Sequence, residues 1–498
     1  MKQFLLSILV LGIVITGFAA CTKKPADSQT PTDDLPVEYQ ETAKEALGFD
    51  KEDNRGTEFQ ILVNNAATHF DMKADFIGDP TGSVVEQAVY KRAAECETYL
   101  GIFLMYKEES GNYNSSVIQN VSNLITAGSC PYDMLAIGLN TGILGKDISL
   151  FYNVLDMDSV NVDHDWWVQD TLEQVSVNGQ LYFLSGDACM STYGYLGCVF
   201  ANLNVSQAFQ QNVDYFELVE QKEWTMDRFF SLFRDVSTDI DEIPGIGLDD
   251  VFGWANVSTG VRVMWSSCDL SLFSRNELTD EIQLKSNLDQ KMLLLIEKLK
   301  DAYDAPNSFY FGNTTMDKAT QAFVNDRCLF YSYYVYRARS FVAEGGNNSA
   351  FAILPLPLYD EDQADYISTN ISAYNALFFP SSVKNPSLAG KVAEFMGWSG
   401  KQTIIPTYYV TYLQIRSTGR EEKNIDMLNL IRDKLRISPN ELYGVIDDIV
   451  GTLALTDRNV IPSVAIATPF YSNPISRWAS IAESVNQDIQ EYIISYYR

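Results

Sequence analysis

Glu58-Phe59-Gln60-Ile61-Leu62-Val63 is a run of β-type composition that stops at Asn64-Asn65 and opens a regular alternation of strands and helices. Ser83 lies three residues before Glu86, which is the capping-box spacing at the start of a helix. The segments that follow predict a strand over 102–106, a helix over 117–125 and a strand over 132–137. Strand, helix, strand, helix and strand in this order predict a parallel sheet covered by helices.

The rest of the chain also contains predicted strands and helices, and it becomes mainly helical towards its end. Trp224-Thr225 is a helix start, and Pro355-Leu356-Pro357 ends a strand because proline stops sheet pairing. Further strands are predicted over 181–184, 197–201, 328–331 and 352–354, and helices over 288–303, 319–324, 388–398, 425–435 and 475–494. The expected fold class is therefore α/β, with two αβ cores and a helical C-terminal part.

The N-terminal residues indicate export. A charged start is followed by the apolar run from Phe4 to Ala20 and by Cys21, which is typical of a signal sequence. Gly17-Phe18-Ala19-Ala20-Cys21 resembles the lipobox of bacterial lipoproteins, which implies a signal peptide over 1–20 and acylation of the Cys21 thiol. An ordinary cleavable peptide and an uncleaved anchor are the alternatives. We expect a cell-membrane protein, lipid-anchored on the extracytoplasmic face, with residues 21–56 as a disordered tether.

Composition excludes several classes of function. The chain has 498 residues and a formal net charge of −29, which disfavours nucleic acid as a partner. It has two histidines, His69 and His164, and no CxxC pair, so the sequence predicts neither a metal site nor a cofactor. Beyond Cys21, six cysteines lie partly within apolar runs, and we expect buried free thiols for most of them.

Several segments, in order, resemble the family 1 extracellular solute-binding proteins, the maltose-binding-protein-like receptors of ABC importers. They are Tyr132-Asp133-Met134-Leu135, Asp165-Trp166-Trp167, Asn178 to Phe183, Glu223 to Asp227, Ala322 to Phe330 and Phe351 to Pro357. Ala201-Asn202-Leu203 and Asn325-Asp326 depart from the usual family pattern.

The resemblance implies a two-lobed periplasmic-binding-protein-like fold of type 2, whose lobes close on a ligand by hinge motion. It places the N-lobe over 57–197 and 366–425, and the C-lobe over 198–365 and 426–498. The implied function is that of a monomeric substrate-binding lipoprotein, which delivers a small-molecule solute, an oligosaccharide, to the permease subunits of an ABC importer.

Sugar sites combine flat aromatic faces with amides and carboxylates, and ligands of open αβ sheets lie beyond strand ends. The positions that resemble the family's ligand loops are Asn64, Asn65, Asn140, Asp187, Tyr193, Tyr195, Trp254 (in a loop formed by Phe252-Gly253-Trp254), Tyr334, Tyr336 and Tyr471. Tyr334 and Tyr336 belong to a run of four tyrosines in six residues, which is hard to bury with every hydroxyl paired. Trp166-Trp167 is interpreted as a structural wedge.

Two other functions stay open. A surface glycoside hydrolase needs two carboxylates at a set separation, and 65 acidic residues cannot identify such a pair. The chain contains neither a GxSxG elbow nor an HExxH motif, so we predict that it is not an enzyme. A ligand-binding lipoprotein that serves a sensor or an adhesin would have the same sequence features.

Overall fold

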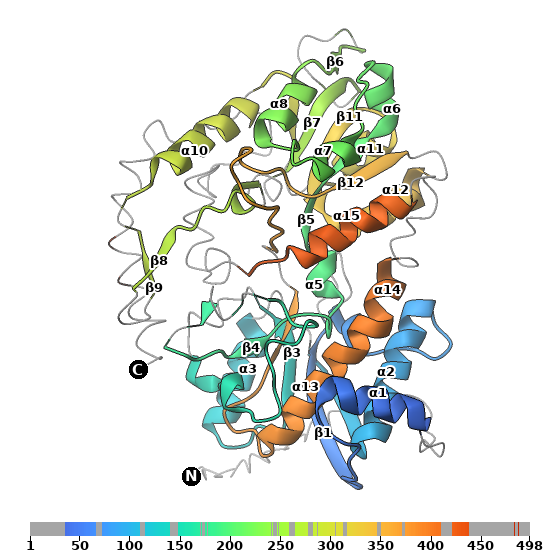
Figure 1. Cartoon of the computed structure of the whole chain (residues 1–498), viewed down its shortest axis with the longest axis vertical. Coiled ribbons are helices and arrows are strands. Elements are labelled where there is room, and N and C mark those ends of the chain that lie inside the picture. Colours follow the sequence, from blue (N-terminus) through green and yellow to red (C-terminus); the bar gives the residue numbers. More distant parts are fainter. Residues whose placement is uncertain are drawn as a thin grey trace, which may run out of the picture.

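The computed structural model shows two αβ lobes, one above the other, joined by segments that cross between them (Figure 1). We call the part around the first sheet the N-lobe and the part around the second sheet the C-lobe. The structure describes residues 35–65, 72–109, 115–139, 148–169, 171, 175–176, 178–240, 242, 247, 249–257, 264–276, 282–285, 287–303, 305–311, 316–345, 350–370, 374–409, 421–437, 483 and 487.

The sheet of the N-lobe has the strand order β2-β1-β3-β13-β4. These strands span Ile102–Glu109 (β2), Thr57–Asn64 (β1), Met134–Gly138 (β3), Asn375–Phe378 (β13) and Phe183–Leu184 (β4). β1 pairs in parallel with both β2 and β3, which confirms the predicted parallel order of the first three strands. Helices α2 (Val84–Leu100), α3 (Ser115–Thr126) and α13 (Pro386–Ser399) belong to this lobe.

The sheet of the C-lobe has the strand order β10-β7-β11-β5-β12, and β6 pairs with β7. The strands span Ser308–Phe311 (β10), Val251–Val257 (β7), Cys328–Tyr334 (β11), Gly197–Asn202 (β5), Phe351–Leu354 (β12) and Ser237–Thr238 (β6). A separate ribbon joins β8 (Phe273–Arg275) and β9 (Ile282–Leu284). The helices of the C-lobe are α6 (Leu203–Ala208), α7 (Tyr215–Glu220), α8 (Met226–Arg234), α10 (Gln290–Tyr303), α11 (Met316–Val324), α12 (Ala338–Gly345) and α15 (Glu421–Asp433).

In each sheet, the strand at which the chain enters the lobe runs against its neighbours, and in the C-lobe the short strand β6 is also antiparallel to β7. β5 starts at Gly197, directly after the short helix α5 (Ser191–Gly194), and is antiparallel to β11. β13 starts at Asn375 and is antiparallel to β3, with Asn375 opposite Gly138. In the C-lobe, Tyr334 at the carboxyl end of β11 is opposite Gly197 at the start of β5, and in the N-lobe Gly138 at the carboxyl end of β3 is opposite Asn375 at the start of β13. Since β5 and β13 both start at the junction between the lobes, the carboxyl ends of the parallel strands in both sheets face this junction.

Local sequence signals explain why several elements begin and end where they do. Ser83 and Glu86 form both hydrogen bonds of the predicted capping box, and α2 ends at Gly101, whose φ of +66° is a left-handed conformation. The Thr225 hydroxyl accepts a hydrogen bond from the backbone N–H of Arg228 and so caps α8. α8 then buries Phe229, Phe230, Leu232 and Phe233 on its inner side.

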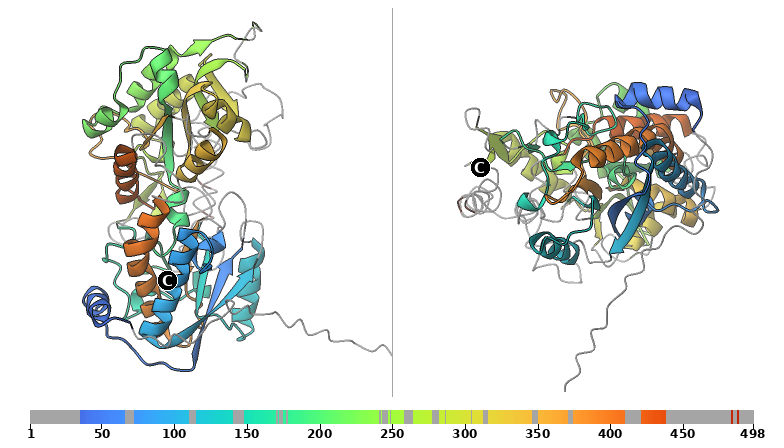
Figure 2. Two further views of the ribbon diagram at one scale, coloured as in Figure 1. Left: turned by 90° about the vertical axis from the view of Figure 1, so that its right-hand side faces the viewer. Right: turned by 90° about the horizontal axis from the view of Figure 1, so that it is seen from below.

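The prediction that residues 21–56 form a disordered tether is wrong for α1 (Val37–Leu47). Ala43 and Leu47, one helical turn apart, are buried, and the Tyr39 ring packs edge-on against Trp398 of α13 at 5.5 Å. Helical spacing of these few apolar residues was enough to dock the segment on the N-lobe, where it lies beside α13 (Figure 2).

The six cysteines of the described chain are free thiols, and five of them are buried, which confirms the expectation for most of them. In the described chain, no helix has both the length and the apolar character needed to cross a membrane. The helix predicted over 475–494 lies outside the described residues, apart from the single positions 483 and 487.

Candidate functional site

The edge of the N-lobe sheet that faces the C-lobe carries the first predicted pair of site residues. Asn64 is the last residue of β1 and is buried, whereas Asn65 is half-buried. The side-chain amide of Asn65 donates to Glu108 Oε2 at 2.7 Å, and Lys73 Nζ lies 3.8 Å from the same oxygen. Amide, carboxylate and ammonium groups therefore meet at the carboxyl ends of β1 and β2, the position at which open αβ sheets bind ligands.

Directly beneath this edge, a buried carboxylate ties two crossing segments to the N-lobe. Asp75 Oδ1 accepts from the backbone N–H of Ser191 at 2.9 Å, and Asp75 Oδ2 accepts from Asn375 Nδ2 at 2.8 Å and from the Ser191 hydroxyl. Ser191 belongs to the first crossing and Asn375 follows the second. Burial raises the pKa of Asp75 from its ordinary 3.8 to about 6, although these donors and Arg92 act in the opposite direction.

Three of the predicted tyrosines form one aromatic cluster where the first crossing meets the C-lobe. The Tyr195 ring lies 5.4 Å from the Tyr334 ring and 5.2 Å from the Tyr336 ring, both edge-on. Tyr331, Tyr333, Tyr334 and Tyr336 are all buried, and the Tyr331 hydroxyl has no hydrogen-bond partner among the described residues, which agrees with the expectation that four tyrosines in six residues are hard to bury with every hydroxyl paired. Contact with a ligand stays a prediction for these residues.

Asp187 and Tyr193 join the two lobes. Asp187 is fully buried in the N-lobe, and its carboxylate accepts from Arg432 of α15 in the C-lobe: Nη2 to Oδ2 is 2.6 Å and Nε to Oδ1 is 3.3 Å. The Tyr193 hydroxyl donates to the same carboxylate. Burial raises the pKa of Asp187, and the charge of Arg432 offsets part of the rise. The group therefore contains a bidentate ion pair that spans the lobe junction.

A cavity of about 510 Å³ lies beside this ion pair and has walls from both lobes. Trp167 and Lys401 line it from the N-lobe, Lys434 and Arg436 from the C-lobe, and Tyr193 from the crossing. Its volume falls within the roughly 300–1,000 Å³ of small-molecule sites. The cations of its walls are paired, for example Lys434 with Asp365 at 2.6 Å and Arg436 with Asp269 at 2.7 Å. From the sequence, Trp167 has a structural interpretation only, and Arg432 is not predicted.

Trp166 and Trp167 are held by one buried carboxylate of α13. Glu394 Oε1 accepts from Trp167 Nε1 at 3.0 Å and from the backbone N–H of Asn161 at 2.9 Å. Its Oε2 accepts from Trp166 Nε1 at 2.9 Å and lies 2.8 Å from His164 Nδ1. The predicted structural role of the two tryptophans fits this arrangement, because Trp167 forms an isolated β-bridge with Gly186 and Trp166 packs against Gly397 of α13.

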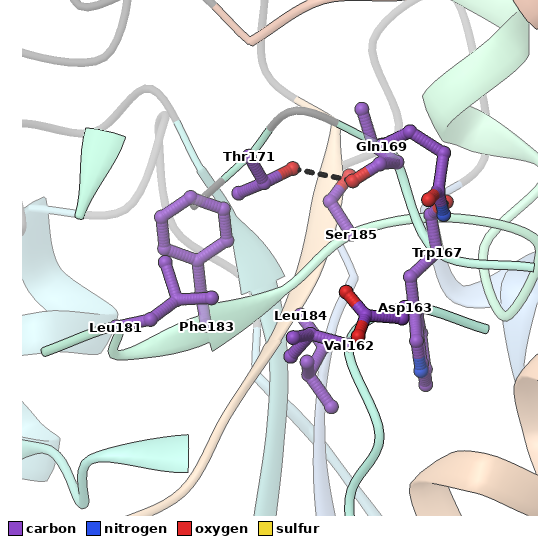
Figure 3. A pocket seen from close by; sticks show the side chains of 10 residues that line it. Val162, Asp163, Trp167, Gln169, Thr171, Leu181, Phe183, Leu184 and Ser185 are labelled. Atoms are coloured by element: carbon purple, nitrogen blue, oxygen red, sulfur yellow. Dashed lines mark hydrogen bonds between the residues drawn. The ribbon is translucent and has the colours of Figure 1, made fainter. Parts of the chain in front are cut away.

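A second, much smaller cavity lies within the N-lobe next to Trp167 (Figure 3). Leu181, Phe183 and Leu184 form its apolar side, and Thr171 Oγ1 donates to the backbone carbonyl of Val168 at 2.6 Å along its rim. Its volume is about 50 Å³, far below the roughly 300–1,000 Å³ of small-molecule sites, so it is too small for a sugar ring.

The prediction that Trp254 lies in a ligand-facing loop is wrong. Trp254 lies in the middle of β7, is fully buried, and donates from Nε1 to the Ser332 hydroxyl at 2.6 Å. The Phe229 and Phe233 rings pack against it at 5.4 and 5.6 Å. Gly253 allows this close packing, since a Cβ atom there would lie 2.2 Å from the carbonyl oxygen of Phe233. Asn140, Tyr471 and Cys21 lie outside the described residues.

The sequence matches no family model and no curated protein. The structure is similar to the galacto-N-biose/lacto-N-biose I-binding protein of an ABC transporter from Bifidobacterium longum, solved with lacto-N-biose, with a TM-score of 0.55 and 10% identity over 89% of this chain and 98% of that one. It is also similar to the sugar-binding protein MalE from Xanthomonas citri, with a TM-score of 0.55 and 11% identity over 88% and 99%.

A designed esterase matches as well, with a TM-score of 0.52 and 12% identity over 89% of this chain and 100% of that chain. At such identities the likeness concerns the fold alone. The predicted two-lobed α/β fold of the solute-binding-protein type is therefore confirmed. What this chain binds has to be argued from its own residues.

Proposed function

We propose that this chain is a solute-binding protein that captures an oligosaccharide between its lobes and delivers it to the permease subunits of an ABC importer. The observation that carries the proposal is the direction of the strands. In both sheets the carboxyl ends of the parallel strands face the lobe junction, so both lobes present their ligand-binding edge to the same space. Hinge motion about the crossing segments then encloses a solute.

The residues at the junction support a sugar as the solute. Tyr195, Tyr334 and Tyr336 gather aromatic rings there, and Asn65 and Glu108 place hydrogen-bonding groups on the opposing lobe. Sugar rings are bound by aromatic faces together with a few polar groups. The sugar-binding function of the two natural structural neighbours agrees with this choice.

Anchoring by Cys21 is part of the proposal. The apolar run from Phe4 to Ala20 supports export, and acylation of Cys21 would keep the protein in the layer where a permease accepts its solute. The polar residues between Cys21 and Leu35 would then separate the membrane from α1.

Thermal unfolding of protein lacking residues 1–21, measured with a panel of oligosaccharides, tests the proposal. A ligand at 100 times its Kd stabilises the native state by about 2.7 kcal/mol. With an unfolding entropy of roughly 0.9 kcal/mol per kelvin for some 440 residues, the melting temperature should rise by about 3 °C. Release of product from a glycoside by the same sample would instead support the hydrolase, and a panel without any shift would contradict sugar binding.

Tyr334→Ala tests the aromatic cluster. The change should weaken binding of the best oligosaccharide by roughly tenfold, since a lost aromatic contact is worth about 0.5–1.5 kcal/mol beyond its area. Tyr215→Ala is the matched control, because Tyr215 is buried in the C-lobe core against Trp224 and Phe330. It should lower stability and leave affinity unchanged. Equal affinities of both variants and the parent protein would exclude Tyr334 from the site.

A further inference from the structure

Arg337 ends the turn that follows β11, at the edge of the C-lobe sheet that faces the junction. The turn spans Val335–Arg337 (η6), and β11 reaches the junction because Tyr334 pairs with Gly197, the first residue of β5 after the crossing. α5, which carries the chain between the lobes, contacts η6. Arg337 therefore lies beside the aromatic cluster of Tyr195, Tyr334 and Tyr336.

The guanidinium of Arg337 is buried between aromatic rings and is poorly neutralised. Its Cζ lies 5.1 Å from the centre of the Tyr333 ring and 5.6 Å from that of the Tyr336 ring, and 6% of its side chain is exposed. Its ion pair is a 3.5 Å contact from Nη1 to Asp317, a residue whose side chain is 83% exposed. Solvent and distance both weaken such a pair.

The other edge of the guanidinium lacks partners. Among the residues that the structure describes, neither Nε nor Nη2 of Arg337 has a hydrogen-bond acceptor, and both atoms are buried. These two nitrogens point the same way and form the fork that matches the two oxygens of a carboxylate. A buried charged donor without an acceptor is strongly unfavourable, so this edge is suited to a ligand that brings its own acceptors.

Because the chain is strongly negative, it needs a cation with free donors to bind an acidic ligand. With a formal net charge of −29, the protein as a whole repels anions. An anionic solute must therefore be recognised by a local cation whose hydrogen bonds are not already taken. Lys401, Arg432, Lys434 and Arg436 around the inter-lobe cavity are each paired with an aspartate.

We propose that Arg337 binds a carboxylate of the solute, which makes acidic saccharides, those that contain uronic acid units, the preferred ligands. The inference rests on the proposed function and narrows its substrate class. The rings of Tyr333 and Tyr336 hold the guanidinium in place, and the Nε and Nη2 edge accepts the carboxylate in a bidentate manner. Binding includes a movement that uncovers this edge.

Isothermal titration of the purified full chain in detergent tests the inference with matched pairs of ligands. Each pair consists of a di- or trisaccharide with a uronic acid unit and its carboxyl-reduced neutral counterpart, over several linkages. We expect the acidic member of the best pair to bind at least tenfold more tightly. Arg337→Gln should remove this preference, so that the acidic and the neutral member of each pair bind with equal affinity.

Arg339→Gln is the matched control, because Arg339 is an exposed arginine of α12, two residues further along the chain. It removes the same charge and should keep the preference. Arg337→Lys keeps the charge without the fork and should retain part of the preference, which covers the case in which Arg337→Gln does not fold.

Three results would overturn the inference. If acidic and neutral members bind equally well, solute binding stands and Arg337 does not select the solute. The same conclusion follows if Arg339→Gln abolishes the preference as fully as Arg337→Gln does. If no saccharide of either kind binds, the proposed function fails, and the inference fails with it.

Discussion

Replacing Arg432 by methionine should test how firmly the lobes are held in the arrangement seen here. Arg432 Nη2 and Nε donate to the Asp187 carboxylate at 2.6 and 3.3 Å, and Asp187 is fully buried while 21% of the Arg432 side chain is exposed. Methionine keeps an apolar stem at this position and removes the guanidinium, which carries the charge and the donors and whose Cζ lies 5.6 Å from the centre of the Tyr193 ring.

The expected loss follows from the burial of the aspartate. Removing one partner of a buried ion pair costs about 3–5 kcal/mol, because the remaining charge is left without compensation. The Tyr193 hydroxyl still donates to Asp187. We therefore expect about 3 kcal/mol, the lower end of the range. With roughly 0.9 kcal/mol per kelvin of unfolding entropy for some 440 residues, the melting temperature should fall by about 3 °C.

Differential scanning calorimetry of a double-mutant cycle measures the pair itself. The cycle consists of Arg432→Met, Asp187→Asn and their combination, and Arg234→Met, at an exposed position of α8, is the control. The double variant should lose clearly less than the sum of the two single variants, by about 1.5 kcal/mol or more. Because the pair spans the junction, Arg432→Met should also change the small-angle scattering profile.

Strictly additive losses would refute this reasoning. A coupling energy below about 0.5 kcal/mol, or a melting temperature of Arg432→Met within about 1 °C of the Arg234→Met control, would show that the pair does not hold the lobes.

Three other changes probe separate parts of the chain. The Glu394 carboxylate serves four donors, and Glu394→Gln leaves one acceptor oxygen for them, so the free energy of unfolding measured by calorimetry should fall by about 3 kcal/mol. The control Glu41→Gln, on the exposed side of α1, should leave the stability unchanged. An unchanged stability of Glu394→Gln would contradict the hydrogen-bond network. Because burial raises the pKa of Asp75 from 3.8 to about 6, its contribution to stability is fully present below about pH 4 and is lost as the pH rises to about 6. The unfolding free energy of the parent protein should therefore decline over this window by up to about 3 kcal/mol relative to Asp75→Asn, and parallel pH profiles would be incompatible with the shift. Cys21→Ala should move the protein from the membrane fraction to the aqueous fraction after cell fractionation, and an unchanged distribution would argue against acylation.

The elements that the sequence predicted well are those whose signals are local. The capping box of Ser83 and Glu86 and the cap at Thr225 depend on residues three positions apart. From β1 to β3, most strands and helices are eight or more residues long, so each is long enough for the spacing of its apolar residues to indicate the type of secondary structure. These patterns match the folded structure because a helix or strand buries the face on which its apolar residues lie.

Two central strands were missed because their signals depend on distant partners. β7 contains Gly253, which suggested a loop, yet the glycine is required by the close approach of the Phe233 carbonyl. β13 has four residues, and its place between β3 and β4 is set by a chain that returns from the other lobe. No periodicity within four residues can indicate that return.

Several side chains at the lobe junction were predicted as ligand contacts, which stay predictions, and the cations beside them were missed. Tyr193 and Asp187 were chosen correctly as residues near the crossing, but their partner Arg432 lies 245 positions from Asp187. Arg337 follows directly after the tyrosine run that was singled out, and its exceptional feature, a donor edge without acceptors, exists only in three dimensions. The ion-pair partner of a side chain and the burial of its donors depend on how distant segments pack, so the sequence alone could not predict them.

A continuous set of contacts links the core of the N-lobe to the C-lobe through the segment that contains the two tryptophans. Glu394 of α13 fixes the indole of Trp166, the carbonyl of Trp166 accepts from the backbone N–H of Asp187 at 2.8 Å, and the side chain of Asp187 binds Arg432. The carboxylate that spans the junction is thus positioned by packing inside one lobe. The proposed hinge motion requires a small number of well-defined lobe orientations, and the buried carboxylate of Glu394 would give this ion pair a rigid support for them.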